Sequence, residues 1–240
     1  MTREYDVTVE GRLHRVVISD EKEALLAAKA AGKASVSLWS REGAGETFLT
    51  RHAVESLDDA TGEYLEKVVR RELGLPWEIA ETRRLRIREF RAEDSLRVIW
   101  EPDDGEDDRV FWCRDHLEEY IRWQYGLWGY GLWALWDRRQ DCLVGKAGVT
   151  VLQWESGEKT AEGLELGYHI FTPFRRKGYA REACEGILMW CKNNGYGHVY
   201  AKTDASNEAS VRLLKSLGFR LIDQRCSGSG RWHCLYGADC

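Results

Sequence analysis

The sequence lacks three features that would assign it to a class at once. It contains no uninterrupted run of about 18 apolar residues, the length that a membrane-spanning helix requires. Residues 1–6 lack the apolar core of a signal peptide. There is no basic excess either, since 35 Lys and Arg stand against 40 Asp and Glu and give a net charge of −5. Proteins that coat nucleic acid normally carry such an excess, so we expect a soluble, cytoplasmic protein with no membrane or nucleic-acid partner.

Cysteine pairs of the kind that bind zinc are also missing. The seven cysteines include no Cys-x-x-Cys, and their number is odd. These facts indicate neither a disulfide framework nor a zinc ribbon. Cys226, Cys234 and Cys240 are open to two interpretations, a metal or thiol site or reduced thiols that act as small apolar side chains. We favour the second and expect no metal.

Residues 1–75 have the pattern of a small Rossmann-like α/β unit. An apolar run at 15–19 predicts a buried strand, good helix formers follow over 21–31, and 34–39 alternates as a second strand. Strand, helix and strand in this order indicate a parallel pair. Apolar residues at helical spacing predict a further helix over 59–73.

Part of this unit resembles the fourth motif of haloacid-dehalogenase-type phosphatases. The residues concerned are Val17-Ile18-Ser19-Asp20 and the Ala-rich helix that ends at Gly32. The resemblance implies that Asp20 stands at a magnesium-binding position of that family. The family's Asp-x-Asp nucleophile is absent, so the resemblance implies a catalytically empty fragment of the fold.

The second domain is predicted to span residues 82–240, after a linker at 76–81 that begins with a helix-breaking Pro76. Leu85 and Ile87 predict a half-buried strand, and an amphipathic helix is expected over 92–100. Three consecutive strands with short polar turns favour an antiparallel meander; they are expected over 129–137, 142–154 and 164–171. A helix, a strand, another helix and a closing strand pair follow.

Two segments of this domain allow more than one interpretation. The acidic residues from Glu101 to Asp108 could steer a cationic amine or form a solvated loop. The Trp- and Tyr-rich residues over 125–136 could line an acceptor groove or form the core of the meander.

The segment Arg175-Arg176-Lys177-Gly178-Tyr179-Ala180 lies between a strand and a helix. A glycine-containing loop at a helix start can direct several backbone N–H groups at an anion, and the helix dipole and basic side chains add to the attraction. This segment could therefore hold a pyrophosphate.

Three elements together resemble the GNAT superfamily of N-acetyltransferases over residues 82–240. The first is Arg175-x-x-Gly178-x-Ala180, which is similar to the acetyl-coenzyme A loop of the superfamily. The second is Asn207-x-x-Ser210 with a helix that ends in Gly218-Phe219. The third, Glu165-Leu166-Gly167-Tyr168, resembles a strand of the ribosomal-protein N-terminal acetyltransferase branch.

This resemblance implies a fold, a cosubstrate and a set of site residues. The fold is α/β (α+β), with a mixed, mostly antiparallel sheet whose two central strands splay apart to admit acetyl-coenzyme A. Glu165 would act as the base. Because Leu214 stands where many relatives have a tyrosine that protonates the thiolate, we name Ser210 as the substitute proton donor, with solvent as an equal alternative. The cofactor-binding residues implied are Phe171, Thr172, Arg175, Arg176, Lys177, Gly178, Tyr179, Ala180 and Asn207.

The predicted function is direct transfer of an acetyl group from acetyl-coenzyme A to a primary amine. An amine must lose a proton before it attacks a thioester, which requires a base near the carbonyl. The acceptor stays open among a protein N-terminus, a polyamine, an aminoglycoside and a small metabolite. The alternative is a catalytically silent acetyl-coenzyme A-binding regulatory protein. The oligomeric state is also open, although strands near the C-terminus could form a homodimer.

Overall fold

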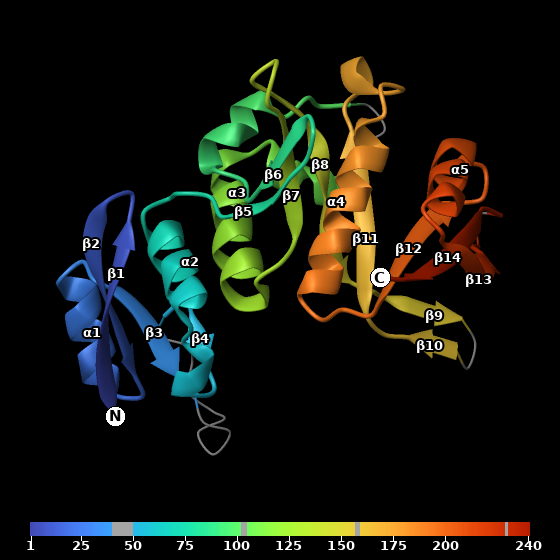
Figure 1. The fold of residues 1–240 in the computed structure, drawn as a ribbon. Coiled ribbons are helices and arrows are strands. Elements are labelled where there is room, and N and C mark those ends of the chain that lie inside the picture. The colour runs from blue at the N-terminus through green and yellow to red at the C-terminus, as the bar shows by residue number, and fades with distance from the viewer. Residues whose placement is uncertain (40–49, 102–104, 157–158, 229) are drawn as a thin grey trace.

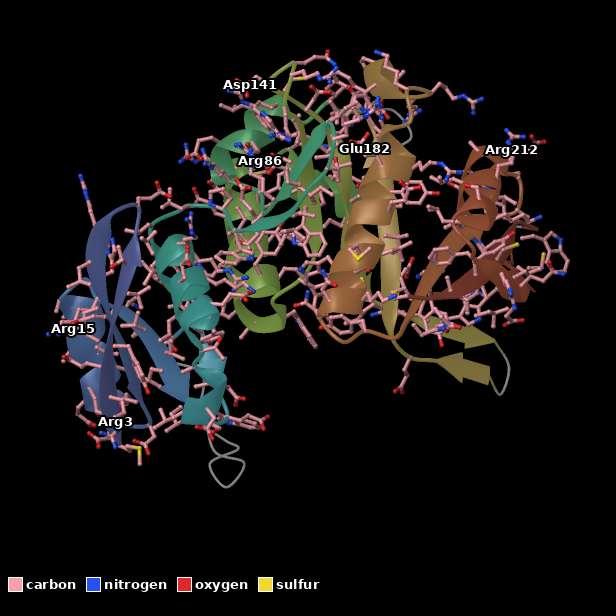
Figure 2. All side chains as sticks on the ribbon, in the orientation of Figure 1. Arg3, Arg15, Arg86, Asp141, Glu182 and Arg212 are labelled. Atoms are coloured by element: carbon pink, nitrogen blue, oxygen red, sulfur yellow. The ribbon has the colours of Figure 1, made fainter. Side chains whose placement is uncertain are left out.

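The computed structural model describes residues 1–39, 50–101, 105–156, 159–228 and 230–240. Its strands form a four-stranded sheet, an eight-stranded sheet and a small two-stranded ribbon (Figure 1). Exposed charged side chains surround both main sheets, as Arg3 and Arg212 illustrate (Figure 2). No helix within these ranges is long and apolar enough to cross a membrane.

The four-stranded sheet forms the N-terminal part of the chain in the order β1-β2-β3-β4. Its strands are β1 (Thr2–Val9), β2 (Arg12–Ser19), β3 (Ala34–Leu38) and β4 (Ala53–Val54). Strands β2 and β3 pair in parallel, as the strand–helix–strand order predicts, and β4 pairs in parallel with β3. Strand β1 forms an antiparallel hairpin with β2. The sequence analysis missed β1 because most of its side chains are exposed and give a weak apolar pattern.

Two helices, α1 (Lys22–Ala30) and α2 (Gly62–Glu72), and the 3₁₀ turn η2 (Leu57–Asp59) complete this unit. Helix α2 begins where Thr61 Oγ1 accepts a hydrogen bond from the N–H of Tyr64 at 3.2 Å, a typical N-cap. The unit buries a cluster of its own, formed by Val9, Val16, Ile18, Val36, Val54, Leu65, Val68 and Val69. This separate cluster supports our proposal that the unit is a domain.

The eight-stranded sheet has the order β13-β14-β12-β11-β8-β7-β6-β5. Its strands are β5 (Glu78–Glu81), β6 (Leu85–Arg88), β7 (Leu132–Asp137), β8 (Cys142–Val151), β11 (Leu164–Ile170), β12 (His198–Asp204), β13 (Arg220–Cys226) and β14 (Trp232–Asp239). Among the described strands of this sheet, only β11 and β12 pair in parallel, so the sheet is mixed and mostly antiparallel, as expected.

The remaining elements lie before, between and beside these strands. They are the 3₁₀ turns η3 (Ala92–Arg97), η4 (Glu106–Phe111) and η6 (Thr172–Phe174), the π-helix η5 (Ile121–Trp128), the helices α3 (Arg114–Tyr120), α4 (Tyr179–Asn193) and α5 (Glu208–Ser216), and the ribbon of β9 (Trp154–Ser156) and β10 (Lys159–Ala161).

Three local expectations differ from the structure. Residues 78–81, assigned to the linker, form β5 and pair with β6. The helix expected over 92–100 is the shorter 3₁₀ turn η3, because Asp94 accepts hydrogen bonds from the N–H of Arg91 and from the guanidinium of Arg88. The strand expected over 142–154 ends at Val151, and the ribbon β9–β10 follows it.

The two central strands of the large sheet splay apart, as the resemblance implies. The ladder between β11 and β12 holds only two residue pairs, Leu164 with Val199 and Glu165 with Tyr200. Each strand pairs over its whole length with its other neighbour, β8 or β14. The backbones therefore separate immediately after Glu165.

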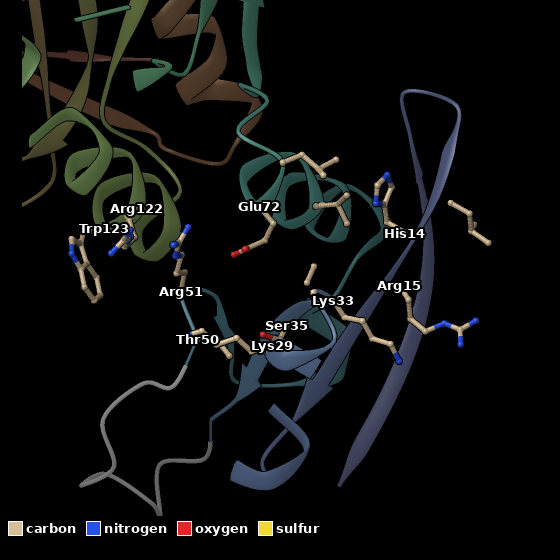
Figure 3. A pocket seen from close by; sticks show the side chains of 15 residues that line it. His14, Arg15, Lys29, Lys33, Ser35, Thr50, Arg51, Glu72, Arg122 and Trp123 are labelled. Carbon is tan, nitrogen blue, oxygen red and sulfur yellow. The ribbon is translucent and has the colours of Figure 1, made fainter. Parts of the chain in front are cut away.

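The N-terminal unit is joined to the rest of the chain by a buried ion pair. Arg71 of α2 donates to Glu89 Oε1 at 2.7 Å, and both side chains are less than a tenth exposed. Close by, a Cβ on Gly126 of η5 would lie 2.9 Å from the carbonyl oxygen of Arg51, so only glycine permits this approach. A cavity of about 540 Å³ lies between α2 and η5 (Figure 3).

Candidate functional site

Glu165 lies at the point where β11 and β12 part. Its side chain is half-buried, and its Oε2 forms an ion pair of 2.8 Å with Nζ of Lys202, two residues beyond the last pair on β12. This ion pair spans the mouth of the opening between the two strands. The sequence analysis did not find Lys202, since nothing local marks it.

The loop before α4 has the backbone shape of an anion cradle. Arg176 and Gly178 adopt positive φ angles of 63° and 84°, and helix α4 begins at Tyr179. The first N–H groups of a helix have no acceptor within the helix, and they carry the positive end of its dipole. Tyr179 and Ala180 belong to the first turn of α4, and the binding of a pyrophosphate by the N–H groups of residues 177–180 stays a prediction.

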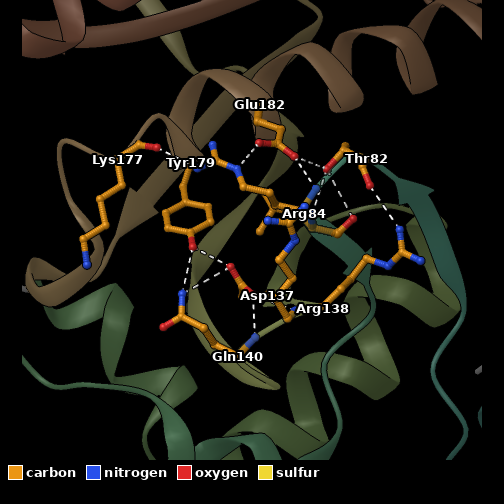
Figure 4. Close-up of polar contacts among 10 residues, drawn as sticks. Thr82, Arg84, Asp137, Arg138, Gln140, Lys177, Tyr179 and Glu182 are labelled. Atoms are coloured by element: carbon orange, nitrogen blue, oxygen red, sulfur yellow. Dashed lines mark hydrogen bonds and ion pairs between the residues drawn. The ribbon is translucent and has the colours of Figure 1, made fainter.

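Arg84 of the β5–β6 turn holds this loop from behind (Figure 4). Its Nη1 donates to the carbonyl oxygen of Lys177 at 2.8 Å, and its Nε donates to Glu182 Oε2 at 2.6 Å. Glu182 Oε1 also accepts hydrogen bonds from Thr82 and from the N–H of Arg84. Burial alone would raise the pKa of Glu182, but the hydrogen bonds from Thr82 and Arg84 lower it overall.

The side chain of Tyr179 anchors the start of α4 and is itself buried. Its hydroxyl donates to Asp137 and accepts from Gln140 Nε2 at 3.1 Å (Figure 4). The guanidinium carbon of Arg84 lies 4.4 Å from the centre of the Tyr179 ring. Tyr179 can thus contribute its backbone N–H to a ligand, while its side chain fixes the helix start.

A second clamp comes from Glu101, which holds the segment that leads into the loop. Its Oε1 accepts the N–H of Thr172 at 2.6 Å, and its Oε2 contacts Nε2 of His169 at 2.9 Å and the guanidinium of Arg175. Arg175 Nε also donates to the carbonyl oxygen of Ile170. Arg175 and Thr172 therefore serve the protein's own structure, and His169 is held as a structural residue.

The backbone of Phe171 does not face the opening, contrary to our expectation. Its N–H donates to the carbonyl oxygen of Val144 on β8 at 3.0 Å. Because alternate residues of a strand direct their backbone groups to opposite neighbours, Leu166, Tyr168 and Ile170 face the β12 side instead. The N–H of Thr172 is used by Glu101. The strand was predicted correctly, but Phe171 belongs to the alternate residues whose backbone groups face β8 and not the opening.

Asn207 and Ser210 lie at the start of α5, on the β12 side of the opening. Asn207 caps the helix, since its Oδ1 accepts the N–H of Ser210 at 3.1 Å. The buried hydroxyl of Tyr168 lies beside the Ser210 side chain but meets no partner in hydrogen-bond geometry within the described chain. Burial raises the pKa of Tyr168 to about 12. Leu214 is fully buried in the core, so it does not face a ligand.

The acidic loop is bound rather than solvated at both of its ends. Glu101 joins the clamp described above, and Asp108 pairs with Lys146, a buried lysine of β8. Residues 102–104 lie outside the described residues. The aromatic segment is divided: Tyr125 and Trp133 are fully buried, whereas Trp128 is exposed.

The cysteines of the described chain are all free thiols, and Cys184, Cys191 and Cys234 are buried. Burial raises the pKa of each of these three thiols, which disfavours the reactive thiolate. No group of three or more His, Cys, Asp or Glu side chains that could hold a metal was found among the residues that the structure describes.

Several solved structures share this fold. A protein of Bordetella pertussis assigned to the GNAT family has 21% sequence identity and a TM-score of 0.54, over 65% of this chain and 96% of its own. A ribosomal-protein-alanine acetyltransferase from Vibrio fischeri has 16% identity and a TM-score of 0.53, over 69% and 96%. A GNAT-family acetyltransferase from Streptococcus pneumoniae has 17% identity and a TM-score of 0.51, over 65% and 98%.

The sequence was also compared with curated proteins and with models of protein families. No curated protein matches this chain significantly. The family model described as an acetyltransferase (GNAT) domain matches residues 84–220, more than half of the chain. It does not reach the N-terminal unit, so the haloacid-dehalogenase resemblance stays a prediction. The chain belongs to the GNAT acetyltransferase family.

Proposed function

We propose that the chain is an N-acetyltransferase that takes its acetyl group from acetyl-coenzyme A and transfers it directly to a primary amine. The observation that carries the proposal is the backbone of the loop before α4, with positive φ angles at Arg176 and Gly178, which follows the strand that parts from β12 at Glu165. The N–H groups of Lys177, Gly178, Tyr179 and Ala180 would bind the pyrophosphate.

Arg176 is the side chain best placed to add charge to this loop. It is exposed, and within the described residues it forms no ion pair, whereas Arg175 is held by Glu101 and by the carbonyl oxygen of Ile170. We assign Arg175 to the support of the loop and Arg176 to the pyrophosphate. Asn207 would bind the pantetheine arm through its amide nitrogen, which its capping interaction does not use.

The backbone groups of Leu166 and Tyr168 would pair with the pantetheine amides. They face the opening that β11 leaves toward β12, while the carbonyl oxygen of Ile170 is already bound by Arg175. This assignment replaces the predicted contacts of Phe171 and Thr172. Acetyl-coenzyme A supplies the thioester carbon that the amine attacks.

Glu165 would accept the proton of the attacking ammonium group, directly or through a water molecule. Its carboxylate already binds one ammonium group, that of Lys202, at 2.8 Å. An acceptor amine would take a similar position beside the same carboxylate. Ser210, next to the Tyr168 hydroxyl, is the proposed donor to the departing thiolate, with solvent as the other source of the proton.

The acceptor is a primary amine, and a peptide N-terminus is the first candidate to examine. The Vibrio fischeri structure with this fold is that of a ribosomal-protein-alanine acetyltransferase. A short peptide with N-terminal alanine is therefore the first substrate to try, followed by spermidine and an aminoglycoside.

The test combines binding and turnover. Acetyl-coenzyme A is titrated calorimetrically into the wild-type protein and into an Arg176→Glu, Gly178→Glu double variant, which we expect to lose binding. Thiol release with each amine is then compared between wild type and Glu165→Gln. We expect the variant to keep its acetyl-coenzyme A affinity and to lose about 100-fold in kcat, as for a general base.

Two results would overturn the proposal. If the wild type does not bind acetyl-coenzyme A, the proposed acetyl transfer is excluded. Binding that is lost in the loop variant, without thiol release for any amine, would favour the alternative of a silent acetyl-coenzyme A-binding protein.

A further inference from the structure

The cavity between the N-terminal unit and η5 is a second candidate site, separate from the acetyl-transfer site. Its volume of about 540 Å³ lies within the range of small-molecule sites, about 300–1,000 Å³. Residues of β2, α1, β3, α2 and η5 line the cavity, together with Thr50 and Arg51 just before β4. The cavity thus lies between side chains of both sheet units.

The lining of this cavity is basic in a chain that is acidic overall. Five Lys and Arg side chains line it, against a single carboxylate, Glu72, whereas the whole chain has a net charge of −5. The five are Arg15, Lys29, Lys33, Arg51 and Arg122. A cavity lined by positive charge attracts ligands that carry negative charge.

Two of these cations form ion pairs with carboxylates, and the other three form none among the described residues. Arg15 pairs with Asp6 and Glu4, and Lys33 also pairs with Glu4. Lys29, Arg51 and Arg122 form no ion pair within the described part of the chain. Lys29 and Arg51 belong to the N-terminal unit, and Arg122 to η5.

Glu72 cannot neutralise this group alone. Its side chain points from α2 toward Arg51 (Figure 3), and the charges of Arg51 and Lys29 contribute to lowering its pKa, after the larger effect of its contact with His52. Nε2 of His52 lies 3.6 Å from Glu72 Oε1, and burial lowers the pKa of His52, so this histidine adds no charge at neutral pH. The positive charge of the cavity therefore exceeds its negative charge.

We infer that this cavity binds a phosphorylated small molecule. Guanidinium groups match phosphate oxygens with paired hydrogen bonds, and Arg51 and Arg122 approach from two different units. Trp123, about half exposed, adds a flat apolar surface to the same wall for the body of the molecule. Such a ligand would be held by both units at once.

Inorganic pyrophosphate is the probe, titrated calorimetrically. Because it can also enter the acetyl-coenzyme A loop, the titration uses the Arg176→Glu, Gly178→Glu protein, in which we expect the loop to bind no anion. We expect one pyrophosphate per chain, with an affinity that falls as the salt concentration rises. Adding Arg51→Gln and Arg122→Gln should weaken binding at least tenfold.

The control adds Arg3→Gln and Arg231→Gln to the same loop variant, which removes two exposed charges that do not line the cavity and should leave binding unchanged. The thermal midpoint of each protein is measured without ligand. Loss of Arg51 and Arg122 should change it little, because the relieved repulsion between like charges offsets the lost attraction of Arg51 to Glu72. The single variant Arg122→Gln, at an exposed helix position, serves if the double variant fails to fold.

Absence of pyrophosphate binding in the loop variant would overturn the inference. So would binding that survives in Arg51→Gln, Arg122→Gln. Neither result depends on acetyl transfer, so the failure of one proposal leaves the other standing.

Discussion

Glu101 accepts the backbone N–H of Thr172 at 2.6 Å. This hydrogen bond joins the segment before η4 to the turn η6, which leads directly into the cofactor loop. Replacing Glu101 by Gln keeps its size but removes the charge that holds Arg175. We expect the dissociation constant of acetyl-coenzyme A to rise about tenfold, which corresponds to about 1.4 kcal/mol. Glu118→Gln, an exposed carboxylate of α3, is the control. An unchanged affinity in Glu101→Gln would show that the clamp does not order the loop.

Three carboxylates with lowered pKa values should make the folded protein less stable in acid. Burial alone would raise the pKa of Glu101, Asp137 and Glu182, but hydrogen bonds from their partners lower each pKa below its ordinary value. Such groups stabilise the fold above their unfolded pKa, which is 4.5 for Glu, and this stabilisation is lost as the pH falls through the folded pKa.

We therefore expect the thermal midpoint to fall steeply below pH 4.5, while these three groups contribute no slope between pH 6 and 8. The measurement is thermal unfolding as a function of pH. Glu101→Gln should show a shallower acid decline than the wild type. Parallel curves for the two proteins would exclude Glu101 as a source of the decline.

Arg84 supports the cofactor loop from the β5–β6 turn, and its removal should affect binding and stability together. Arg84→Gln loses the hydrogen bond to Lys177 and leaves Glu182 without its cation. We expect acetyl-coenzyme A to bind about tenfold more weakly, and the free energy of unfolding to fall by about 2 kcal/mol. Calorimetry and urea unfolding measure the two effects. Arg181→Gln, at an exposed position of α4, should change neither the affinity for acetyl-coenzyme A nor the free energy of unfolding.

The pair of Arg71 and Glu89 is buried, so removing one partner differs from removing both. Arg71→Met alone leaves an uncompensated buried carboxylate and should cost about 3–5 kcal/mol of unfolding free energy. The double variant Arg71→Met, Glu89→Leu should recover most of that loss. A double-mutant cycle by denaturant unfolding measures the difference. Additive effects would mean that the two side chains do not stabilise each other.

Leu214 stands where many relatives carry a tyrosine, but here it is 1% exposed and part of the main core. We expect Leu214→Tyr to overpack this core and to lower the free energy of unfolding by about 1–3 kcal/mol. Thiol release should not increase. A stable and faster variant would show that the position opens to the departing thiolate after all.

The features that the sequence predicted well are local ones. The place of the segment Arg175–Ala180 at a helix start was predicted correctly, because its glycine and the first helical residues lie within six consecutive positions. Its binding of a pyrophosphate stays a proposal. The strands of the meander and helices α2 and α4 were found because their apolar residues repeat at the period of the element. Parallel pairing in the N-terminal unit followed from element order alone.

The features that were missed depend on contacts between distant residues. Glu101 meets His169, Thr172 and Arg175 across 68 to 74 positions of the chain, and no local pattern reveals this. Phe171 was assigned to the wrong side of its strand because the direction of a backbone N–H depends on register, which the sequence does not show. Lys202 was missed because its partner lies on another strand.

The short ladder between β11 and β12 gives the large sheet two edges in its interior. Exposed edges at the rim of a sheet can recruit strands from other molecules and lead to aggregation. These two edges face each other within one chain, with α4 packed on β11 and α5 on β12. Because both edges belong to one chain and each strand is packed by a helix, we expect the opening to take a ligand without recruiting a strand from another molecule.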